Sequence, residues 1–340
     1  LDFAALAEAD LVVEAVFEDL GVKREVFRRL AQVCRPDAVL GTNTSSFAVE
    51  DLAEGLAHPE RVVGLHYFYH PAKNRLVEVI PGKASDPAVT RRAWTVQEQI
   101  GKTPIASADA SGFIVNRYFV PWLNEAVRLL EEGKADIPTI EAASKKAFGV
   151  GMGPFELMNV TGVPIALHAA TTLGQAFGPM YVPAQKLRAQ VESGALWPLD
   201  GAADETKLSL VADRLLAVTF LVAAQLVDEG VGSIEDTDIG ARVGLRWPRG
   251  PFELMNRLGT DKAAALVSAF AAGWSVPVPR VLAERAAAKQ PFSFELVRTS
   301  IADGVATLTV HRPDAMNALN EAVVTQLRER FDAVASDPAV

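Results

Sequence analysis

The sequence predicts an α/β domain followed by a mostly helical region, and three features of the chain carry this prediction. Short apolar runs alternate with helical patterns up to about residue 109, which favours a partly parallel sheet covered by helices. Strand patterns are then rare until about residue 290. The stretch GPFELMN occurs at 153–159 and again at 250–256, which indicates an internal repeat in the helical region.

Apolar runs and helical periodicity locate the elements of the α/β region. Leu11-Val12-Val13 is apolar without alternation, which is typical of a strand buried on both faces. Val22, Val26 and Phe27 share one face of a helix predicted over 21–33. The other predicted strands lie at 38–42, 62–65, 76–80 and 103–105, and the other predicted helices at 49–56 and 87–100.

A shift of 97 positions aligns much more of the chain than the repeated stretch itself. Arg117 falls on Arg214, Glu132 on Glu229 and Gly153 on Gly250, all without a gap. A constant offset over about 40 residues indicates a duplicated helical unit, whose first copy begins with a long helix predicted at 113–130. The domain boundaries that we predict are 1–109, 110–200, 201–290 and 291–340.

The two copies differ at positions that bear on function. Asn116 corresponds to Asp213, and Gly149 corresponds to Arg246. A neutral amide can donate a hydrogen bond to an oxygen atom, whereas an ionised carboxylate only accepts one. We therefore interpret the first copy as part of a site and the second copy as structural, packing as a lid or as a substitute for a dimer partner.

The composition narrows the classes of function. The net charge of −9 and the pI of about 5.2 argue against a nucleic-acid-binding protein. Cys34 is the single cysteine, which suits a reducing compartment, and we expect a cytoplasmic protein. The most apolar stretches, such as 215–227, are too short to span a bilayer. We expect no metal site.

Polar residues gather where the predicted strands end. Asn43-Thr44-Ser45-Ser46 follows one strand and His66 follows the next, and ligands of open α/β sheets bind beyond such carboxyl ends. His66 beside Glu78 would be a general base oriented by a carboxylate. The alternatives are a structural histidine, a carboxylate that faces solvent from an edge strand, and a 43–46 segment that only forms a turn and a helix cap.

Five stretches in this order identify a resemblance: LVVEAVFEDLGVKREVF, NTSSF, GLHYF, LVEVI and SGFIVNR. Together they resemble the (S)-3-hydroxyacyl-CoA dehydrogenase family of fatty-acid β-oxidation, over about residues 5 to 290. The resemblance implies a Rossmann domain that binds NAD, followed by an all-α C-terminal domain that is duplicated here. It also implies oxidation of (S)-3-hydroxyacyl-CoA to 3-oxoacyl-CoA, an acyl-CoA substrate, and an assembly that could be a homodimer.

The resemblance assigns roles to eight residues. It implies that His66 is the catalytic base and that Glu78 orients it. It also implies that Ser45 and Asn116 contact the substrate oxygen. The residues placed on the cofactor side are Ala15, Glu18, Lys23 and Asn43. The stretch after His66 departs from the family's Phe-Phe-Asn-Pro, because Tyr69 stands where the family's asparagine would contact the nicotinamide side.

Two further features suggest a piece of a longer protein. No Gly-x-Gly-x-x-Gly turn precedes the first strand, so we expect a partial Rossmann domain that lacks its N-terminal strands and binds NAD poorly. The tail GVATLTVHRPDAMNALN, at 304–320, resembles the start of the enoyl-CoA hydratase (crotonase) family, which implies a bifunctional parent. We expect its strands at 294–297 and 305–310 and a helix at 317–333.

Two other functions stay open from the sequence. One is a non-catalytic acyl-CoA-binding or assembly module, which the missing phosphate-binding turn favours. The other is a related β-hydroxyacid dehydrogenase that acts on a substrate without CoA. A requirement for the CoA thioester would distinguish a 3-hydroxyacyl-CoA dehydrogenase from this β-hydroxyacid dehydrogenase.

Overall fold

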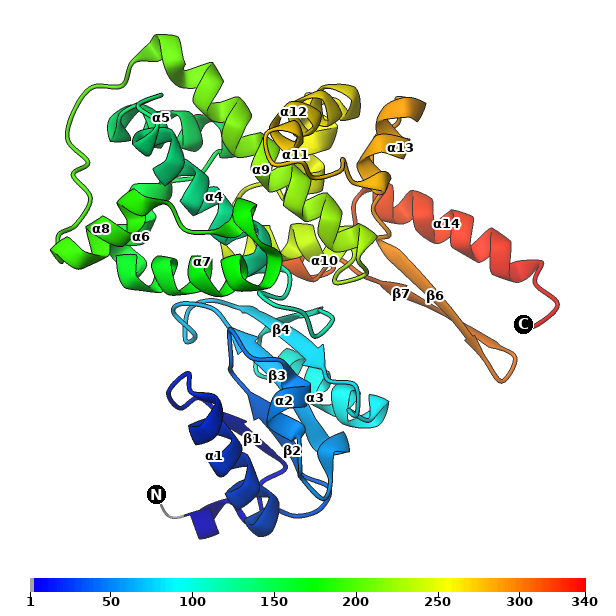
Figure 1. Ribbon diagram of the computed structural model, residues 1–340. Helices are drawn as coiled ribbons and strands as arrows, with labels where there is room; N and C mark the ends of the chain where they lie inside the picture. Colours follow the sequence, from blue (N-terminus) through cyan, green and yellow to red (C-terminus); the bar gives the residue numbers. More distant parts are fainter. Residues whose placement is uncertain (1–2) are drawn as a thin grey trace. The chain divides into compact units, whose positions relative to one another are not determined.

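The computed structural model describes residues 3–340, which form two compact units (Figure 1). The first unit extends to Pro291 and contains a five-stranded sheet and a helical region. The second unit comprises Phe292–Val340.

The sheet of the first unit runs in the order β1-β2-β3-β4-β5. Three pairings are parallel, and β3 pairs with β4 in antiparallel register. The strands are β1 (Leu11–Glu14), β2 (Val39–Thr42), β3 (Val62–Tyr67), β4 (Leu76–Pro81) and β5 (Thr103–Ala106). The structure thus confirms a partly parallel sheet with a strand at each predicted place.

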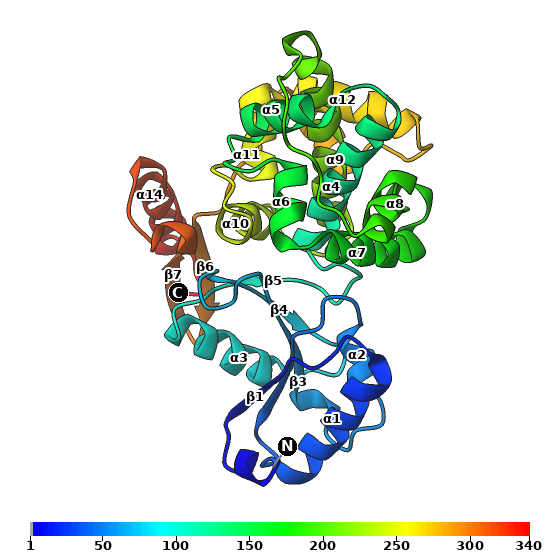
Figure 2. The ribbon, with the colours of Figure 1, turned by 90° about the vertical axis from the view of Figure 1, so that its left-hand side faces the viewer.

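Helices cover both faces of this sheet, as Figure 2 shows. Helix α1 (Leu20–Val33) and helix α2 (Val49–Ala53) bury Phe27, Leu30 and Leu52 against one face. Helix α3 (Pro87–Gln99) buries Val89 and Ala93 against the other. Helix α2 is shorter than predicted, because the chain turns at Gly55, whose φ of 77° is in the left-handed region. The short 3₁₀ turns are η1 (Phe3–Leu6) and η2 (Pro59–Arg61).

The helical region is built around two long helices, α4 (Val115–Glu131) and α9 (Leu208–Asp228), which pack against each other. The other elements of its first half are α5 (Ile137–Phe148), α6 (Pro154–Thr161), α7 (Val163–Phe177), η3 (Pro179–Tyr181), α8 (Gln185–Ser193) and η4 (Glu205–Lys207). Those of its second half are α10 (Ile234–Ile239), the π-helical turn η5 (Gly240–Gly244), α11 (Pro251–Leu258), α12 (Thr260–Ala272) and α13 (Arg280–Ala288).

The structure confirms the duplication at the level of single contacts. Helices α6 and α11 have equal length and begin 97 residues apart. Each receives a buried carboxylate from the preceding helix at its N-terminus. Glu141 accepts backbone hydrogen bonds from Gly153, Phe155 and Glu156, and Asp238, which is 97 residues later, accepts them from Phe252 and Glu253. This capping pair was not predicted, because Glu in one copy and Asp in the other do not appear as an identical position when the repeats are aligned.

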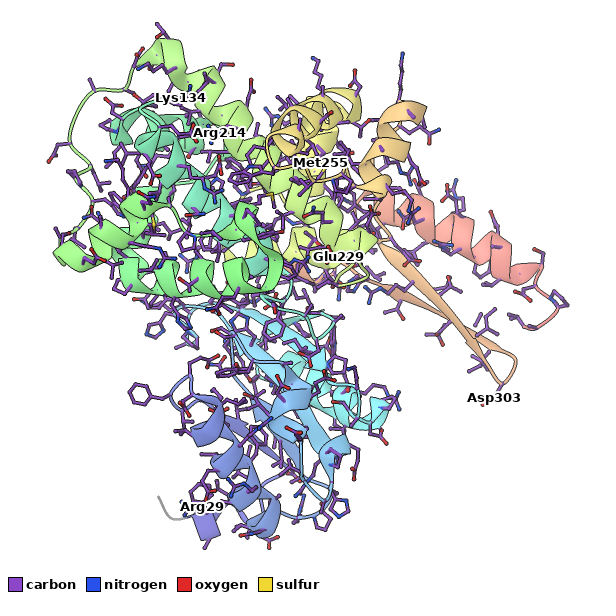
Figure 3. The ribbon with its side chains drawn as sticks, in the orientation of Figure 1. Arg29, Lys134, Arg214, Glu229, Met255 and Asp303 are labelled. Carbon is purple, nitrogen blue, oxygen red and sulfur yellow. The ribbon has the colours of Figure 1, made fainter. Side chains whose placement is uncertain are left out.

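Two ion pairs join the copies reciprocally. Arg117 of the first copy pairs with Glu229 of the second at 2.5 Å, and Arg214 of the second pairs with Glu132 of the first at 2.5 Å. Arg214 and Glu229 are labelled in Figure 3. Both the arginines and the glutamates are 97 residues apart, so the copies meet as the two halves of an isologous interface do.

Helix α9 has the length and apolar composition of a membrane-spanning helix. Its apolar residues, such as Leu215, Phe220 and Leu226, are buried inside the helical region. It packs on α4, α5 and α12. Helix α9 is therefore the central core helix of this region.

The second unit is a β-hairpin with one helix, comprising β6 (Val297–Ala302), β7 (Val305–Val310), the turn η6 (Pro313–Ala315) and α14 (Glu321–Ala335). The hairpin turns at Asp303 and Gly304, both with positive φ, as a two-residue Asp-Gly turn requires. Asp303 is labelled at the hairpin tip in Figure 3.

Two predicted elements of this unit were misplaced. The first strand was predicted at 294–297 but starts at Val297, because Gln326 binds the backbone of Phe294 and Leu296 instead. The helix was predicted from residue 317 but starts at Glu321. Asn317 has a left-handed φ of 55°, and Asn320 caps the helix by accepting the N–H of Val323 at 3.0 Å.

Candidate active site

His66 and Glu78 form a buried pair at the centre of the sheet. They are direct register partners on the antiparallel strands β3 and β4, so their side chains lie on the same face. His66 Nδ1 lies 2.6 Å from Glu78 Oε2. His66 is 6% exposed and Glu78 is 0% exposed. Because β4 lies between β3 and β5, the alternative of a solvent-facing edge carboxylate is wrong.

The second oxygen of Glu78 is held by the N-terminus of α4. Glu78 Oε1 accepts the backbone N–H groups of Ile114 at 3.1 Å and Val115 at 2.9 Å. A helix N-terminus favours a negative charge, so the carboxylate is compensated although water does not reach it. Glu78 thus joins the histidine of the sheet to the first turn of the helical region.

The SGFIVNR stretch makes this junction. Gly112 and Phe113 both have positive φ, of 75° and 47°, and this reverses the chain between β5 and α4. A side chain at Gly112 would clash with Leu173, since its Cβ would lie 2.7 Å from the leucine. The Phe113 ring lies 5.5 Å from the His66 ring, and Phe68 lies 4.6 Å from it on the β3 side. The imidazole is therefore fixed by packing as well as by its hydrogen bond.

A cavity of about 480 Å³ opens in front of His66. Ser45 and Asn116 line it together with His66, so three of the predicted site residues meet at one place, with Glu78 behind them. Helices α4, α6 and α7 and the bend before α6 supply most of the apolar wall, which includes Phe119, Leu123, Met152, Leu157, Val160 and Ile165.

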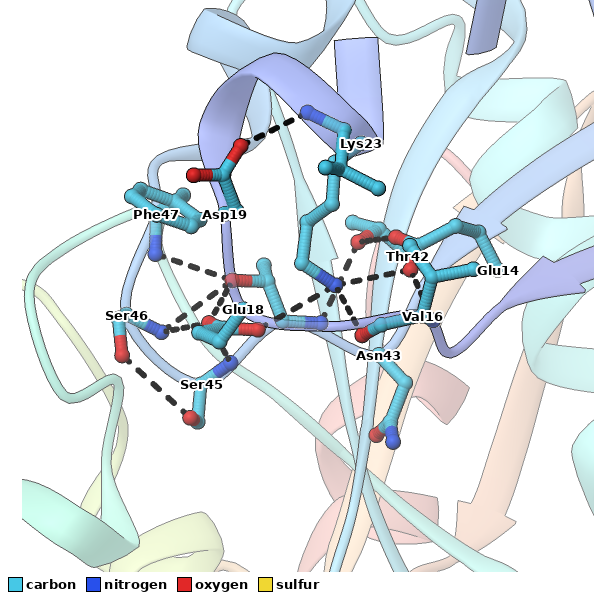
Figure 4. A network of polar contacts seen from close by, with 12 residues as sticks. Glu14, Val16, Glu18, Asp19, Lys23, Thr42, Asn43, Ser45, Ser46 and Phe47 are labelled. Carbon is cyan, nitrogen blue, oxygen red and sulfur yellow. Dashed lines mark hydrogen bonds and ion pairs between the residues drawn. The ribbon is translucent and has the colours of Figure 1, made fainter. Parts of the chain in front are cut away.

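Glu18 and Lys23 lie in a polar network under the 43–47 loop, shown in Figure 4. The Lys23 ammonium is buried and lies 2.8 Å from Glu14 Oε1 and 3.2 Å from Glu18 Oε2. Glu18 Oε1 accepts the backbone N–H groups of Ser45 and Ser46, both at 3.0 Å. These contacts join the loop that carries Ser45 to Glu18 and Lys23.

The charge on Glu18 is stabilised by its surroundings. Burial acts to raise the pKa of Glu18, but the hydrogen bond from Thr44 and the positive charge of Lys23 outweigh it. The pKa of this carboxyl is therefore below its ordinary value, and Glu18 is ionised at neutral pH. Thr44 also accepts the N–H groups of Ser46 and Phe47, so the 43–46 segment is a turn, as the alternative interpretation expected, and also part of the cavity wall.

Asn43 and Ala15 lie at the carboxyl ends of β2 and β1. Asn43 Oδ1 accepts the backbone N–H of Tyr67 at 2.9 Å, which joins the ends of β2 and β3. Ala15 directly follows β1 and is exposed. Neither lines the cavity in front of His66, and neither do Glu18 and Lys23.

Several residues of the cavity wall were not among the predicted site residues. His168 of α7 lines the cavity, with its Nε2 3.5 Å from Ser46 Oγ. Gly244, Leu245 and Arg246 come from the second helical copy, which we had interpreted as structural. The replacement of Gly149 by Arg246 was the one signal in the sequence that could have revealed this contribution.

The fold and the site define a class of protein. A partly parallel sheet with a buried, carboxylate-oriented histidine near a strand end, facing a cavity lined by helices, is compatible with a nucleotide-dependent oxidoreductase. Family comparison then gives the particular assignment. Residues 1–110 match the 3-hydroxyacyl-CoA dehydrogenase NAD-binding domain, and residues 112–198 and 210–293 each match the family's C-terminal domain. The chain belongs to the 3-hydroxyacyl-CoA dehydrogenase family.

Solved structures of similar proteins agree with this assignment. FadB2 from M. tuberculosis is 35% identical, with 59% of this chain and 72% of that chain covered and a TM-score of 0.56. (S)-3-hydroxybutyryl-CoA dehydrogenase PaaH1 from Ralstonia eutropha is 28% identical over the same shares, with a TM-score of 0.56. The 3-hydroxybutyryl-CoA dehydrogenase of Escherichia coli shares the fold over 85% of this chain and 83% of its own, with a TM-score of 0.78 and 24% identity.

NAD is the cofactor of this family, and the described residues fit its reactive end. The carboxyl ends of the parallel strands β1, β2 and β3 lie along one edge of the sheet, where a dinucleotide binds in such folds. At that edge Ala15 is small and exposed, and the loop after Asn43 is held rigid from below by Glu18 and Lys23.

Proposed function

We propose that the protein interconverts (S)-3-hydroxyacyl-CoA and 3-oxoacyl-CoA with NAD, as a step of fatty-acid β-oxidation. The observation that carries the proposal is the His66–Glu78 pair at the wall of a cavity that Ser45 and Asn116 also line. A base, its orienting carboxylate and two hydroxyl or amide donors then surround one carbon–oxygen bond.

The pair sets the tautomer of His66, and therefore which ring nitrogen can take the proton. When Nδ1–H of His66 donates to Glu78, the other ring nitrogen, Nε2, carries the lone pair. His66 then accepts the proton of the substrate 3-hydroxyl, and Glu78 stabilises the imidazolium that forms. The chemistry that bound NAD would supply is that of an acceptor for the hydride that leaves carbon 3. In the reverse direction His66 returns the proton to the 3-oxo oxygen.

Ser45 and Asn116 position the reacting oxygen. Their hydroxyl and amide groups can donate hydrogen bonds to an oxygen that carries negative charge in the transition state. Asn116 lies in the first turn of α4, whose backbone also holds Glu78, so both are positioned by the same turn. The apolar wall from α4, α6 and α7 suits the acyl chain of the substrate.

We propose that Ala15 and Asn43 contact the cofactor at the carboxyl ends of β1 and β2, outside the cavity in front of His66. Glu18 and Lys23 act beneath them. Because the Lys23 ammonium is buried, it contributes by holding Glu18 and the loop after β1 rather than by extending into open space. Replacement of Lys23 by Met is expected to weaken NAD binding through loss of loop order.

The experiment measures acetoacetyl-CoA-dependent oxidation of NADH, in this chain and in any longer product of its gene. His66→Ala is expected to lower kcat by between about 10²-fold and 10⁴-fold. Asn116→Ala is expected to lower kcat by about 10²-fold, since one donor to the oxygen is lost. Asp213→Ala is the matched control, because Asp213 occupies the equivalent position in the second copy and does not line the cavity.

Other results would contradict the proposal in identifiable ways. Turnover that survives His66→Ala would refute the assignment of the base. Equal losses from Asn116→Ala and Asp213→Ala would refute the division of labour between the copies. Binding of acyl-CoA without turnover would favour the non-catalytic module, and turnover of a 3-hydroxyacid without CoA would favour the related β-hydroxyacid dehydrogenase.

We further propose that residues 292–340 are the start of an enoyl-CoA hydratase-like domain of a bifunctional parent. The support is the 304–320 stretch together with the apolar side chains that the unit leaves exposed, including Val305, Met316, Leu319 and Phe331. Hydration of crotonyl-CoA by the longest product of the gene tests this proposal. A product that extends past residue 340 without that activity would contradict it.

A further inference from the structure

The charged side chains that line the cavity in front of His66 are all basic. None of its lining side chains among the described residues is acidic, although the chain contains 42 Asp and Glu and has a net charge of −9. His70, Lys73 and Arg246 line it and are exposed, so they lie at its solvent-facing rim. Within the described part of the chain none of these three forms an ion pair. A concave site with one sign of charge concentrates ligands of the opposite sign.

The two basic segments are joined by a buried side chain. Asn74, which is 6% exposed, donates Nδ2 to the carbonyl of Gly244 at 2.8 Å and to that of Tyr69 at 3.2 Å. The loop that carries Lys73 is thereby held against the segment that carries Arg246. The two halves of the rim therefore come from the loop between β3 and β4 and from the second helical copy, and Asn74 joins them.

Arg246 has a backbone conformation that its residue type disfavours. Its φ is 57°, in the left-handed region, and the equivalent residue of the first copy is Gly149, with a φ of 70°. Glycine adopts this conformation without a steric penalty, whereas an arginine there is strained. Backbone strain at one position, where the other copy of the repeat has an unstrained glycine, indicates a functional role for the side chain. That side chain lines the cavity.

We propose that Arg246 and Lys73, with His70 beside them, form an anion subsite that holds a phosphate or carboxylate group of the acyl-CoA substrate. This inference rests on the proposed function and extends it to the recognition of the substrate. Two groups have the required chemistry: the phosphates of CoA, and a carboxylate at the far end of the acyl chain. The second helical copy then contributes a specificity-determining residue to the site.

Binding by calorimetry tests the subsite without any turnover, so its outcome is independent of whether the dehydrogenase assay succeeds. The probes are CoA, pantetheine, hexanoyl-CoA and adipyl-CoA, measured with the wild type and with Arg246→Gly. A phosphate site predicts that Arg246→Gly raises the Kd for CoA about fivefold, the effect of one exposed ion pair, and leaves pantetheine unchanged. A carboxylate site predicts the same loss for adipyl-CoA, with CoA and hexanoyl-CoA unchanged.

Controls separate recognition from folding. Arg246→Gly relieves the strained conformation, so its Tm is expected to equal or exceed that of the wild type while binding weakens. Arg246→Lys is expected to retain most of the affinity, and adding Lys73→Ala to Arg246→Gly is expected to weaken binding further. Arg257→Ala removes an exposed arginine from α11 outside the cavity and should leave every Kd unchanged. Equal Kd values in the wild type and Arg246→Gly for all probes would overturn the proposal.

Discussion

The His66–Glu78 pair shows how much of the chemistry is decided at single residues. The two are register partners on adjacent antiparallel strands, so a shift of one residue in either strand would place them on opposite faces of the sheet. Their residue types and their places at a strand end and within a strand pointed to a base and its orienter. The distance between them, and the backbone donors on Glu78, follow from the pairing of β3 with β4 and from the approach of α4.

Replacement of Glu78 by Gln is expected to lower kcat by roughly 10³-fold or more. A glutamine amide can donate to Nδ1, which favours the tautomer whose Nε2 carries the hydrogen and cannot act as a base. Steady-state kinetics would check this, with Glu50→Gln as control, because Glu50 is partly exposed and does not line the cavity. KM is expected to change little. A rise in KM that matches the fall in kcat would instead mean that the variant has displaced α4, and Asn116 with it.

At the scale of elements, helix termini and tight turns position the site. The left-handed residues Gly112 and Phe113 place the N-terminus of α4 on Glu78, and a buried carboxylate caps each helix that begins with Gly-Pro-Phe-Glu. Hydrophobic periodicity predicted that these helices exist. It did not predict the caps, because the capping groups are separated in sequence from the helices that they cap.

Asp238, which caps α11, makes the stability of the protein depend on pH. Burial raises the pKa of Asp238 to about 7, against the lowering effect of the Phe252 N–H and of the Arg242 charge. Because the folded-state pKa lies above the ordinary value of 3.8, the protonated form is favoured in the fold. This contribution to stability is complete below pH 3.8 and is lost as the pH rises through about 7.

The Tm difference between the wild type and Asp238→Asn measures this contribution. Asparagine does not ionise, so the wild type is expected to lose stability relative to the variant between about pH 5.5 and about pH 8. Thermal unfolding at the two pH values provides the comparison, with the exposed Asp213→Asn as control. A Tm difference that stays constant over this range would show that Asp238 does not titrate there.

At the scale of the whole molecule, the two helical copies of one chain contact each other in the way that two subunits of a symmetric dimer do. Arg117–Glu229 and Arg214–Glu132 repeat the same contact in both directions across the copies. The symmetry is broken at a buried position. Arg214 also pairs at 2.5 Å with Glu125, which is 0% exposed, whereas the equivalent of Glu125 in the second copy is Val222.

Arg214→Ala is expected to destabilise the protein by about 3 kcal/mol, because it leaves the buried Glu125 carboxylate with fewer partners. Adding Glu125→Gln is expected to restore part of this loss, since the uncompensated charge is removed. Urea unfolding of the two variants measures both effects. The matched comparison is Arg117→Ala with Glu229→Gln. There we expect no rescue, because Glu229 is half exposed and stays hydrated. Equal rescue in both pairs would contradict the argument.

The sequence by itself determined the order of strands and helices, the duplication, and the family to which the first unit belongs. These properties depend on local periodicity and on motifs that are contiguous in the chain. It also selected His66, Ser45 and Asn116, which line one cavity in the structure, and Glu78, which binds His66 from behind. In the second unit its boundaries were displaced by several residues, because Gln326 and Asn320 make contacts that periodicity does not encode.

The contribution of the second helical copy to the cavity is visible only in the tertiary structure. Arg246 is 180 residues from His66 along the chain, and it lines the same cavity because Asn74 and Gly244 join the two segments. The same holds for the buried position of Lys23 and for the reciprocal ion pairs between the copies. Such contacts depend on how distant segments pack, and no local pattern of residues specifies that packing.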